Sequence, residues 1–259
     1  MKKFILSLIP FACAVAACNT VSIEQPVQYG ELSIALADEP VLEVETKAAE
    51  TLDKTSEAAK DYTVRVFNSS NQQQGEDVSY YAFETMKLPL GTYYVTAENC
   101  SEADAESGNG KMRIAGQSSN VTLDVNNLSQ EPTVSCGVTN AKVTVAFDSS
   151  VSGKFSNLKV VLEGGTERTS SLTVNETEAG VENETWFNPS TLNYTISGKF
   201  NSLDKDVSLT GSRTLEAKDN IKILVKVNLE NGQLSIATIE VDDSINMEED
   251  IEEEFNPYN

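Results

Sequence analysis

NIKILVKVNLENGQLSIATI, the stretch from Asn220 to Ile239, decides the fold class of this chain. Apolar residues alternate with polar or charged ones on both sides of the sequence Glu230-Asn231-Gly232. This period of two is typical of half-buried strands. Asn-Gly between two such segments is the strongest short-range hairpin signal, because a type I′ turn needs positive φ at both central residues. We therefore predict an antiparallel β-hairpin here.

Similar alternation recurs upstream at short spacing, with turn residues between the segments. Strands in this pattern, with few helical windows, favour a β-sandwich over an α/β fold. We predict an all-β chain of two tandem β-sandwich domains, residues 30–138 and 139–241, with one short surface helix between Lys47 and Lys60. The main predicted strands are Gly30–Ala37, Tyr62–Phe67, Val78–Phe83, Thr92–Glu98, Val121–Val125, Ala141–Phe147, Leu158–Leu162, Ser171–Val174 and Leu192–Ser197.

The N-terminus has the pattern of an export signal. Lys2 and Lys3 precede an apolar run that is too short to span a bilayer, and Ala16-Ala17-Cys18 follows it. Small residues before a cysteine resemble the bacterial lipobox. We expect residues 1–17 to be a signal peptide, Cys18 to carry lipid that holds the chain on a membrane, and residues 18–29 to form a tether. The alternative is an ordinary secreted protein in which Cys18 is incidental.

The charge of the chain is strongly negative, with a formal net charge of −21 at pH 7. Nucleic acids and anionic lipid surfaces need positive potential, so neither is an expected partner. Residues 242–259 are especially acidic, and no Lys or Arg follows Lys226. We expect an acidic disordered tail there, a solubilising terminus rather than a partner-binding or cation-binding segment.

Most residue-level chemistries have no candidate in this sequence. The chain contains no histidine, which excludes Ser-His-Asp and Cys-His nucleophiles and histidine-ligated metals. Glu102, Asp104 and Glu106 alternate in a glycine-containing loop, as calcium ligands do. The glycine is not at the sixth position of this loop, however, and the closing glutamate is missing. No catalytic, cofactor-binding or metal-binding residue is predicted, and no context selects a carboxylate pair for glycoside hydrolysis.

Two cysteines remain in the predicted domains, Cys100 and Cys136. In an oxidising compartment they are a candidate disulfide that closes a loop of about 35 residues. The alternative is two separate buried thiols, because a sequence does not give the separation of their Cα atoms.

Three pairs of adjacent aromatic residues bear on ligand binding: Tyr80-Tyr81, Tyr93-Tyr94 and Trp186-Phe187. Such rings could stack on a sugar. Strand geometry sends alternate side chains to opposite faces, so we expect one member of each pair to pack in the core.

Three segments behind the lipobox carry a resemblance: Tyr29–Ile34, Met86–Ala97 and Val134–Val145. They resemble a family of Bacteroidetes surface lipoproteins built on a domain of unknown function. More distantly, the chain is similar to fimbrillin-type pilus subunits. The resemblance implies two tandem immunoglobulin-like or transthyretin-like sandwiches, and a lipid anchor in the outer membrane at the cell surface. Fimbrillins also imply strand exchange after cleavage at an arginine of the N-terminal domain, whereas the first arginine here, Arg65, lies inside a predicted strand.

The expected function is therefore that of a lipid-anchored, non-enzymatic surface lipoprotein with an adhesive, structural or fimbria-related role. Its expected partners are the membrane, through lipid on Cys18, and a protein or glycan at the cell surface. The alternative is a glycan-binding surface lipoprotein associated with polysaccharide uptake.

Overall fold

A computed structural model describes residues 27–38, 50–176, 178–228, 234–241 and 251–255. The first part of the chain contains the short helices η1 (Ala58–Lys60), η2 (Tyr80–Ala82) and α1 (Glu102–Ala105). Its strands are β1 (Tyr29–Leu32), β2 (Ala35–Asp38), β3 (Glu50–Thr51), β4 (Thr63–Asn68), β5 (Gln73–Ser79), β6 (Met86–Pro89), β7 (Gly91–Glu98), β8 (Ile114–Gln117), β9 (Val121–Leu123), β10 (Ser129–Gln130) and β11 (Thr133–Val138).

The second part contains longer strands and one short helix, η3 (Ser149–Val151). Its strands are β12 (Ala141–Phe147), β13 (Phe155–Glu163), β14 (Leu172–Asn175), β15 (Asn183–Phe187), β16 (Ser190–Phe200), β17 (Lys205–Leu215), β18 (Asn220–Asn228), β19 (Leu234–Val241) and β20 (Ile251–Phe255). The chain is thus predominantly β, as the alternation predicts.

A sandwich of two sheets forms the second part. One sheet has the order β15-β12-β18-β19-β20 and the other β14-β13-β16-β17. Buried side chains of both sheets, such as Val143 and Ile221 from the first and Leu162 and Ile196 from the second, pack in one hydrophobic cluster. The predicted hairpin is confirmed by the antiparallel pairing of β18 with β19. Its turn residues, 229–233, lie outside the described residues.

The first part buries a separate hydrophobic cluster, which draws on residues from Leu32 to Val138. Its larger sheet has the order β3-β2-β11-β8-β7-β4-β5, with β9 also paired to β7, and a smaller sheet has the order β10-β1-β6. The predicted strand Gly30–Ala37 is in fact two strands. β1 runs parallel to β10, and β2 runs parallel to β11 in the other sheet. Pro132, which has no N–H to donate, separates β10 from β11.

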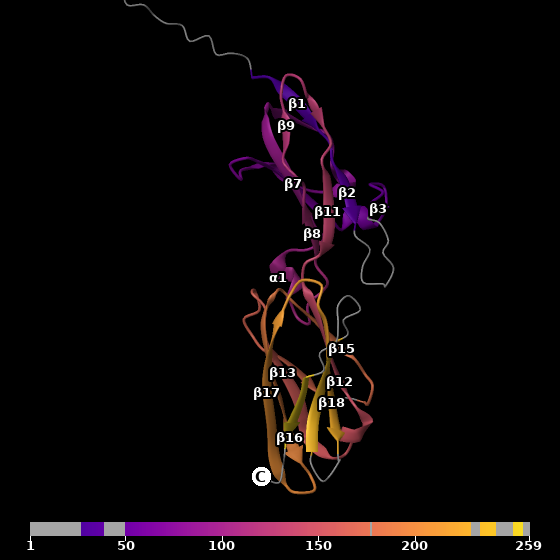
Figure 1. Ribbon diagram of the computed structural model, residues 1–259. Helices are drawn as coiled ribbons and strands as arrows, with labels where there is room; N and C mark the ends of the chain where they lie inside the picture. Colours follow the sequence, from indigo (N-terminus) through magenta and orange to yellow (C-terminus); the bar gives the residue numbers. More distant parts are fainter. Residues whose placement is uncertain (1–26, 39–49, 177, 229–233, 242–250, 256–259) are drawn as a thin grey trace, which may run out of the picture.

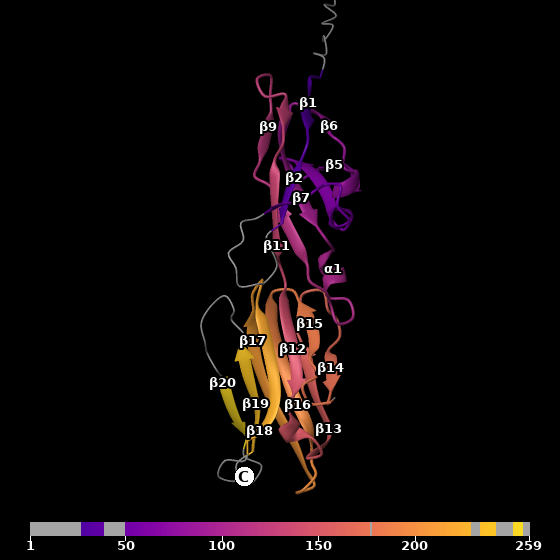
Figure 2. The same cartoon turned by 90° about the vertical axis from the view of Figure 1, so that its right-hand side faces the viewer.

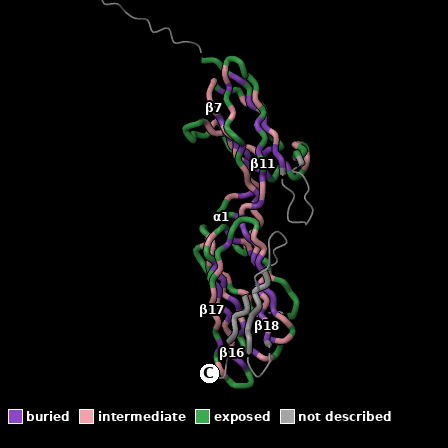
Figure 3. Tube along the Cα trace, in the orientation of Figure 1, coloured by how far each residue is buried: buried purple, intermediate pink, exposed green. Residues whose placement is uncertain are grey.

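The two clusters lie one beyond the other in an elongated molecule (Figures 1 and 2). Figure 3 shows buried residues along both parts, interspersed with exposed ones. Between β11 and β12 the chain has only Thr139 and Asn140. The buried amide of Asn140 accepts a hydrogen bond from the Arg113 N–H and donates one to the Lys111 carbonyl, at 3.0 and 2.8 Å. This connection is therefore tied to the end of the first part.

Two further expectations differ from the structure. The helix predicted over Lys47–Lys60 is wrong where residues are described, since Glu50–Thr51 is strand β3 and only Ala58–Lys60 is helical, as η1. Residues 39–49 lie outside the described ranges. The tail predicted as disordered includes β20, where Ile251 stands opposite Ile239 and Phe255 opposite Leu234. None of the helices in the described ranges is long and apolar enough to cross a membrane.

Gly116 offers a test of how closely β8 approaches β11. A Cβ atom there would overlap the backbone oxygen of Ser135, whereas one at Gly91 would meet only the Tyr93 ring at ordinary contact distances. We expect Gly116→Ala to destabilise the first part by about 2 kcal/mol, as overpacking does. Gly91→Ala is the matched control, with no comparable loss. Chemical denaturation of both variants measures this, and equal midpoints would contradict the register.

Candidate functional site

A buried carboxylate joins the first part of the molecule to the second. Ser101 caps the N-terminus of α1 by accepting a hydrogen bond from the Asp104 N–H at 3.1 Å. Glu106 follows directly after α1, and its side chain turns toward the second part. Only 4% of Glu106 is exposed to solvent. A buried charge is costly unless partners surround it, so the contacts of Glu106 decide what it does.

Four backbone N–H groups of the second part donate to the Glu106 carboxylate. Oε1 accepts from Thr166 at 3.3 Å and from Asn188 at 2.6 Å. Oε2 accepts from Glu167 at 2.6 Å and from Arg168 at 2.9 Å. We call these five residues the Glu106 junction. Hydrogen bonds to a charged acceptor are about twice as strong as neutral ones, so this cluster is a strong connection between the two parts.

Gly165 makes room for this approach. A Cβ atom on Gly165 would overlap the Glu106 carboxylate, and its φ of +90° is a conformation that residues with side chains rarely adopt. The segment after β13 therefore bends so that successive N–H groups point at one anion. Such a concave run of N–H donors is a general way to hold a negative charge.

Arg168 adds one further contact across the same boundary and two within the second part. Its Nη1 donates to the Gly108 carbonyl at 2.6 Å, and its Nη2 to the Trp186 carbonyl at 3.3 Å. The guanidinium also lies over the Phe187 ring, 5.0 Å from its centroid. Burial lowers the pKa of Arg168, and the negative charge of Glu106 opposes this shift. The cation therefore helps to balance the buried carboxylate.

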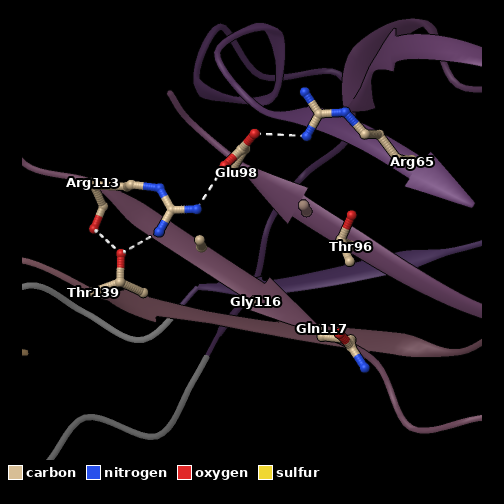
Figure 4. Close-up of a pocket in the computed structure, with 9 residues that line it drawn as sticks. Arg65, Thr96, Glu98, Arg113, Gly116, Gln117 and Thr139 are labelled. Atoms are coloured by element: carbon tan, nitrogen blue, oxygen red, sulfur yellow. Dashed lines mark hydrogen bonds and ion pairs between the residues drawn. The ribbon is translucent and has the colours of Figure 1, made fainter. Parts of the chain in front are cut away.

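A second feature, a shallow pocket of about 400 Å³, lies on the larger sheet of the first part (Figure 4). Glu98 of β7 stands between two arginines there. Its Oε1 accepts from Arg65 at 2.6 Å, and its Oε2 from Arg113 at 2.8 Å. Arg65 also contacts Asp77 of β5 at 2.8 Å. The hydrogen bond to Glu98 raises the pKa of Arg65; Asp77 adds to this effect and burial opposes it.

Arg113 uses its whole guanidinium within this network. Besides Glu98, its Nε donates to the Cys100 carbonyl at 3.2 Å and its Nη1 to the Thr139 hydroxyl at 3.0 Å. The carboxylate and both arginines thus hold neighbouring segments together and have little spare capacity for a ligand. Arg65 lies in β4 between β5 and β7, which confirms its predicted place inside a strand.

The three loop acids that resemble calcium ligands do not converge. Glu102 lies 3.5 Å from Arg113, while Glu106 points into the Glu106 junction. In the described part of the chain, no group of three potential metal ligands comes together. The sequence pattern therefore singles out Glu106 but does not predict the backbone N–H groups that bind it. These partners lie 60 to 82 positions further along the chain, and no local pattern marks them.

Cys100 and Cys136 are both buried, and no disulfide joins them to each other. The Cys100 thiol contacts the Met112 carbonyl, and Cys136 pairs in register with Gly116. Met112 and Gly116 are four positions apart on one segment, so their Cα atoms are about 13 Å apart in an extended chain. A disulfide needs Cα atoms closer than about 7 Å. Of the two alternatives, the structure contains separate buried thiols, and burial raises the pKa of Cys100.

One member of each aromatic pair packs in a core, as strand geometry predicts. Tyr80, Tyr93 and Phe187 are buried. The Trp186 side chain packs against the first cluster although the residue belongs to the second part. Its backbone N–H donates to the Asn109 carbonyl at 2.9 Å. Trp186 is thus part of the boundary rather than an open sugar platform. Cys18 lies outside the described residues.

Glu106→Gln tests the Glu106 junction. The amide presents an NH₂ group to backbone N–H donors in either orientation and removes the charge. We expect a loss of about 2–4 kcal/mol in the free energy of unfolding. Glu102→Gln in α1 is the matched control, because that exposed carboxylate makes only a peripheral ion pair, and its loss should stay below about 1 kcal/mol. Denaturant titration measures both, and equal losses would contradict the assigned role.

Thiol labelling tests the state of Cys100 and Cys136. Alkylation of the protein before and after denaturation, without reductant, should modify both cysteines only after denaturation. Burial protects the thiols in the folded state, and no disulfide has to be reduced. Mass mapping of the peptides reads out the result. A cross-linked peptide pair containing Cys100 and Cys136 would contradict this account.

Comparisons with known proteins place the chain in a family. A family described as Domain of unknown function (DUF4493) matches residues 28–256. No curated protein matches. Among solved structures, the fimbrial anchor protein Mfa2 from Porphyromonas gingivalis is 10% identical, with 82% of this chain and 97% of that chain covered and a TM-score of 0.47. A fimbrial assembly protein from Parabacteroides distasonis is 12% identical, with 83% and 99% covered and a TM-score of 0.39.

At these identities and TM-scores, the structural likeness transfers no role to this chain. The family match covers both hydrophobic clusters and the whole boundary between them. It confirms the expected resemblance to a family built on a domain of unknown function. The chain belongs to the DUF4493 family.

Proposed function

We propose that this chain is a lipid-anchored, non-enzymatic lipoprotein of the outer membrane, displayed at the cell surface with an adhesive, structural or fimbria-related role. The observation that carries the proposal is the small-residue sequence ending at Cys18, behind a basic and apolar leader. The described chain begins at one end of an elongated molecule, as Figure 1 shows. A lipid on Cys18 would hold the protein by that end.

The two hydrophobic clusters support a division into two tandem domains that meet near residue 138. In this proposal both are sandwiches of the immunoglobulin-like or transthyretin-like kind, joined by the two residues between β11 and β12. The Glu106 junction keeps them in a fixed relation. A rigid pair of domains suits a stalk or an adhesive subunit, because it projects its far end at a defined distance from the membrane.

A non-enzymatic role fits the use that the protein makes of its buried and half-buried charges. Glu98 is neutralised by Arg65 and Arg113, and Glu106 is bound by backbone N–H groups. Groups so fully engaged are positioned to support structure rather than to transfer protons. A partner at the surface would be a protein or a glycan, since the net charge of −21 opposes nucleic acid.

Cys18→Ala tests the anchor. Metabolic labelling with palmitate should be lost, and the protein should leave the membrane fraction, because the thiol that carries the lipid is gone. Cys13→Ala is the matched control, because Cys13 lies in the predicted signal peptide and its loss should change neither result. Undiminished palmitate labelling of Cys18→Ala would contradict the proposal.

A further inference from the structure

Four exposed apolar residues gather at the end of the molecule where the described chain begins. They are Val27, Tyr29, Val125 and Leu128, which are 50 to 64% exposed. We call them the apolar tip. Seven large hydrophobic side chains are exposed in the described ranges, and the other three, Tyr81, Val181 and Leu203, lie elsewhere. β1 and β9 mark this end in Figures 1 and 2.

The apolar tip stands on an ordered backbone. The Glu31 N–H donates to the Leu128 carbonyl at 2.7 Å, which brings β1 beside the start of β10. The Asp124 carboxylate accepts from the N–H groups of Asn126 and Asn127 at 2.7 and 2.9 Å, which fixes the turn that presents Val125. The exposure of these side chains is therefore a property of the fold.

We propose that the apolar tip rests in the boundary between lipid headgroups and acyl chains of the membrane that anchors the protein. This inference rests on the proposed lipid on Cys18. Val27 is only nine positions after Cys18, so a lipidated cysteine lies within about 30 Å of the tip even when the chain is fully extended. The membrane surface is thus always within reach of this end.

The chemistry of the tip suits a lipid interface better than a protein partner. Aliphatic side chains enter the acyl region, while tyrosine has an apolar ring and a polar hydroxyl that fit the headgroup level. A stable protein interface buries about 800 Å² on each side, with roughly 20–30 residues, and four side chains are too few. An anchored protein needs much less, because its effective concentration at the membrane is already high.

The charges around the tip indicate which lipids it would accept. Glu31 of β1 stands opposite Lys87 of β6, so one pair of opposite charges lies across these strands. Asp124 and Glu131 leave this end slightly acidic. An acidic rim opposes anionic headgroups. The tip therefore fits zwitterionic lipid, and contact should depend little on salt.

Depth-dependent fluorescence quenching tests this contact on the full chain. The protein is produced in a bacterium that processes lipoproteins, and Leu128→Cys is labelled with a fluorophore. It is then reconstituted into phosphatidylcholine vesicles that carry nitroxides on their acyl chains. Leu203→Cys, in the turn between β16 and β17, is the matched control. Buried Cys100 and Cys136 should react little, and the unsubstituted chain gives the background.

We expect at least threefold stronger quenching at position 128 than at position 203, and the same strong quenching for Val125→Cys. If the protein stays on the vesicles but positions 128 and 203 are quenched equally, the proposed membrane contact of the apolar tip is wrong, while the proposed lipid anchor still holds. If the full chain leaves the vesicles, as we expect of Cys18→Ala, both the lipid anchor and the membrane contact of the apolar tip are contradicted.

Discussion

A single buried carboxylate fixes the relation between the two hydrophobic clusters. Glu106 is nearly excluded from solvent, and four backbone N–H groups of the second part donate to its oxygens. Movement of that backbone away from Glu106 would break four charge-assisted hydrogen bonds, which are stronger than neutral ones. The short helix α1 directly precedes Glu106, Gly165 has no Cβ that would overlap the carboxylate, and Arg168 donates to both Glu106 and Trp186.

The Glu106 junction limits how far the two parts can bend relative to each other. The linker of two residues, Thr139 and Asn140, could act as a hinge between the two parts. The Glu106 junction and the hydrogen bonds of the Asn140 amide to the first part both restrain such bending. The Arg65–Glu98–Arg113 network stiffens the sheet of the first part next to that boundary. If lipid holds the N-terminal end and the apolar tip contacts the membrane, the second sandwich stands away from the surface in a defined direction.

The sequence predicted local structure better than long-range contacts. The hairpin from Asn220 onward follows from its alternation and its Asn-Gly turn, which act between neighbouring residues. By contrast, β17 has few apolar residues, so its hydrophobic alternation is weak. It is a strand because it pairs with β16 along its whole length, which no local pattern predicts. Glu106 lay in a segment that looked like a solvated loop. Its partners are set by tertiary packing, and only the structure brings them together.

A distance measurement between the two parts tests whether Glu106 holds them together. Spin labels at Tyr81→Cys and Leu203→Cys, both exposed positions, report on the first and second parts in pulsed electron resonance. The account predicts one narrow distance distribution in the parent chain, which broadens in Glu106→Gln and stays narrow in Glu102→Gln. A broad distribution in the parent chain, or one unaffected by Glu106→Gln, would contradict the claim that this carboxylate holds the two parts together.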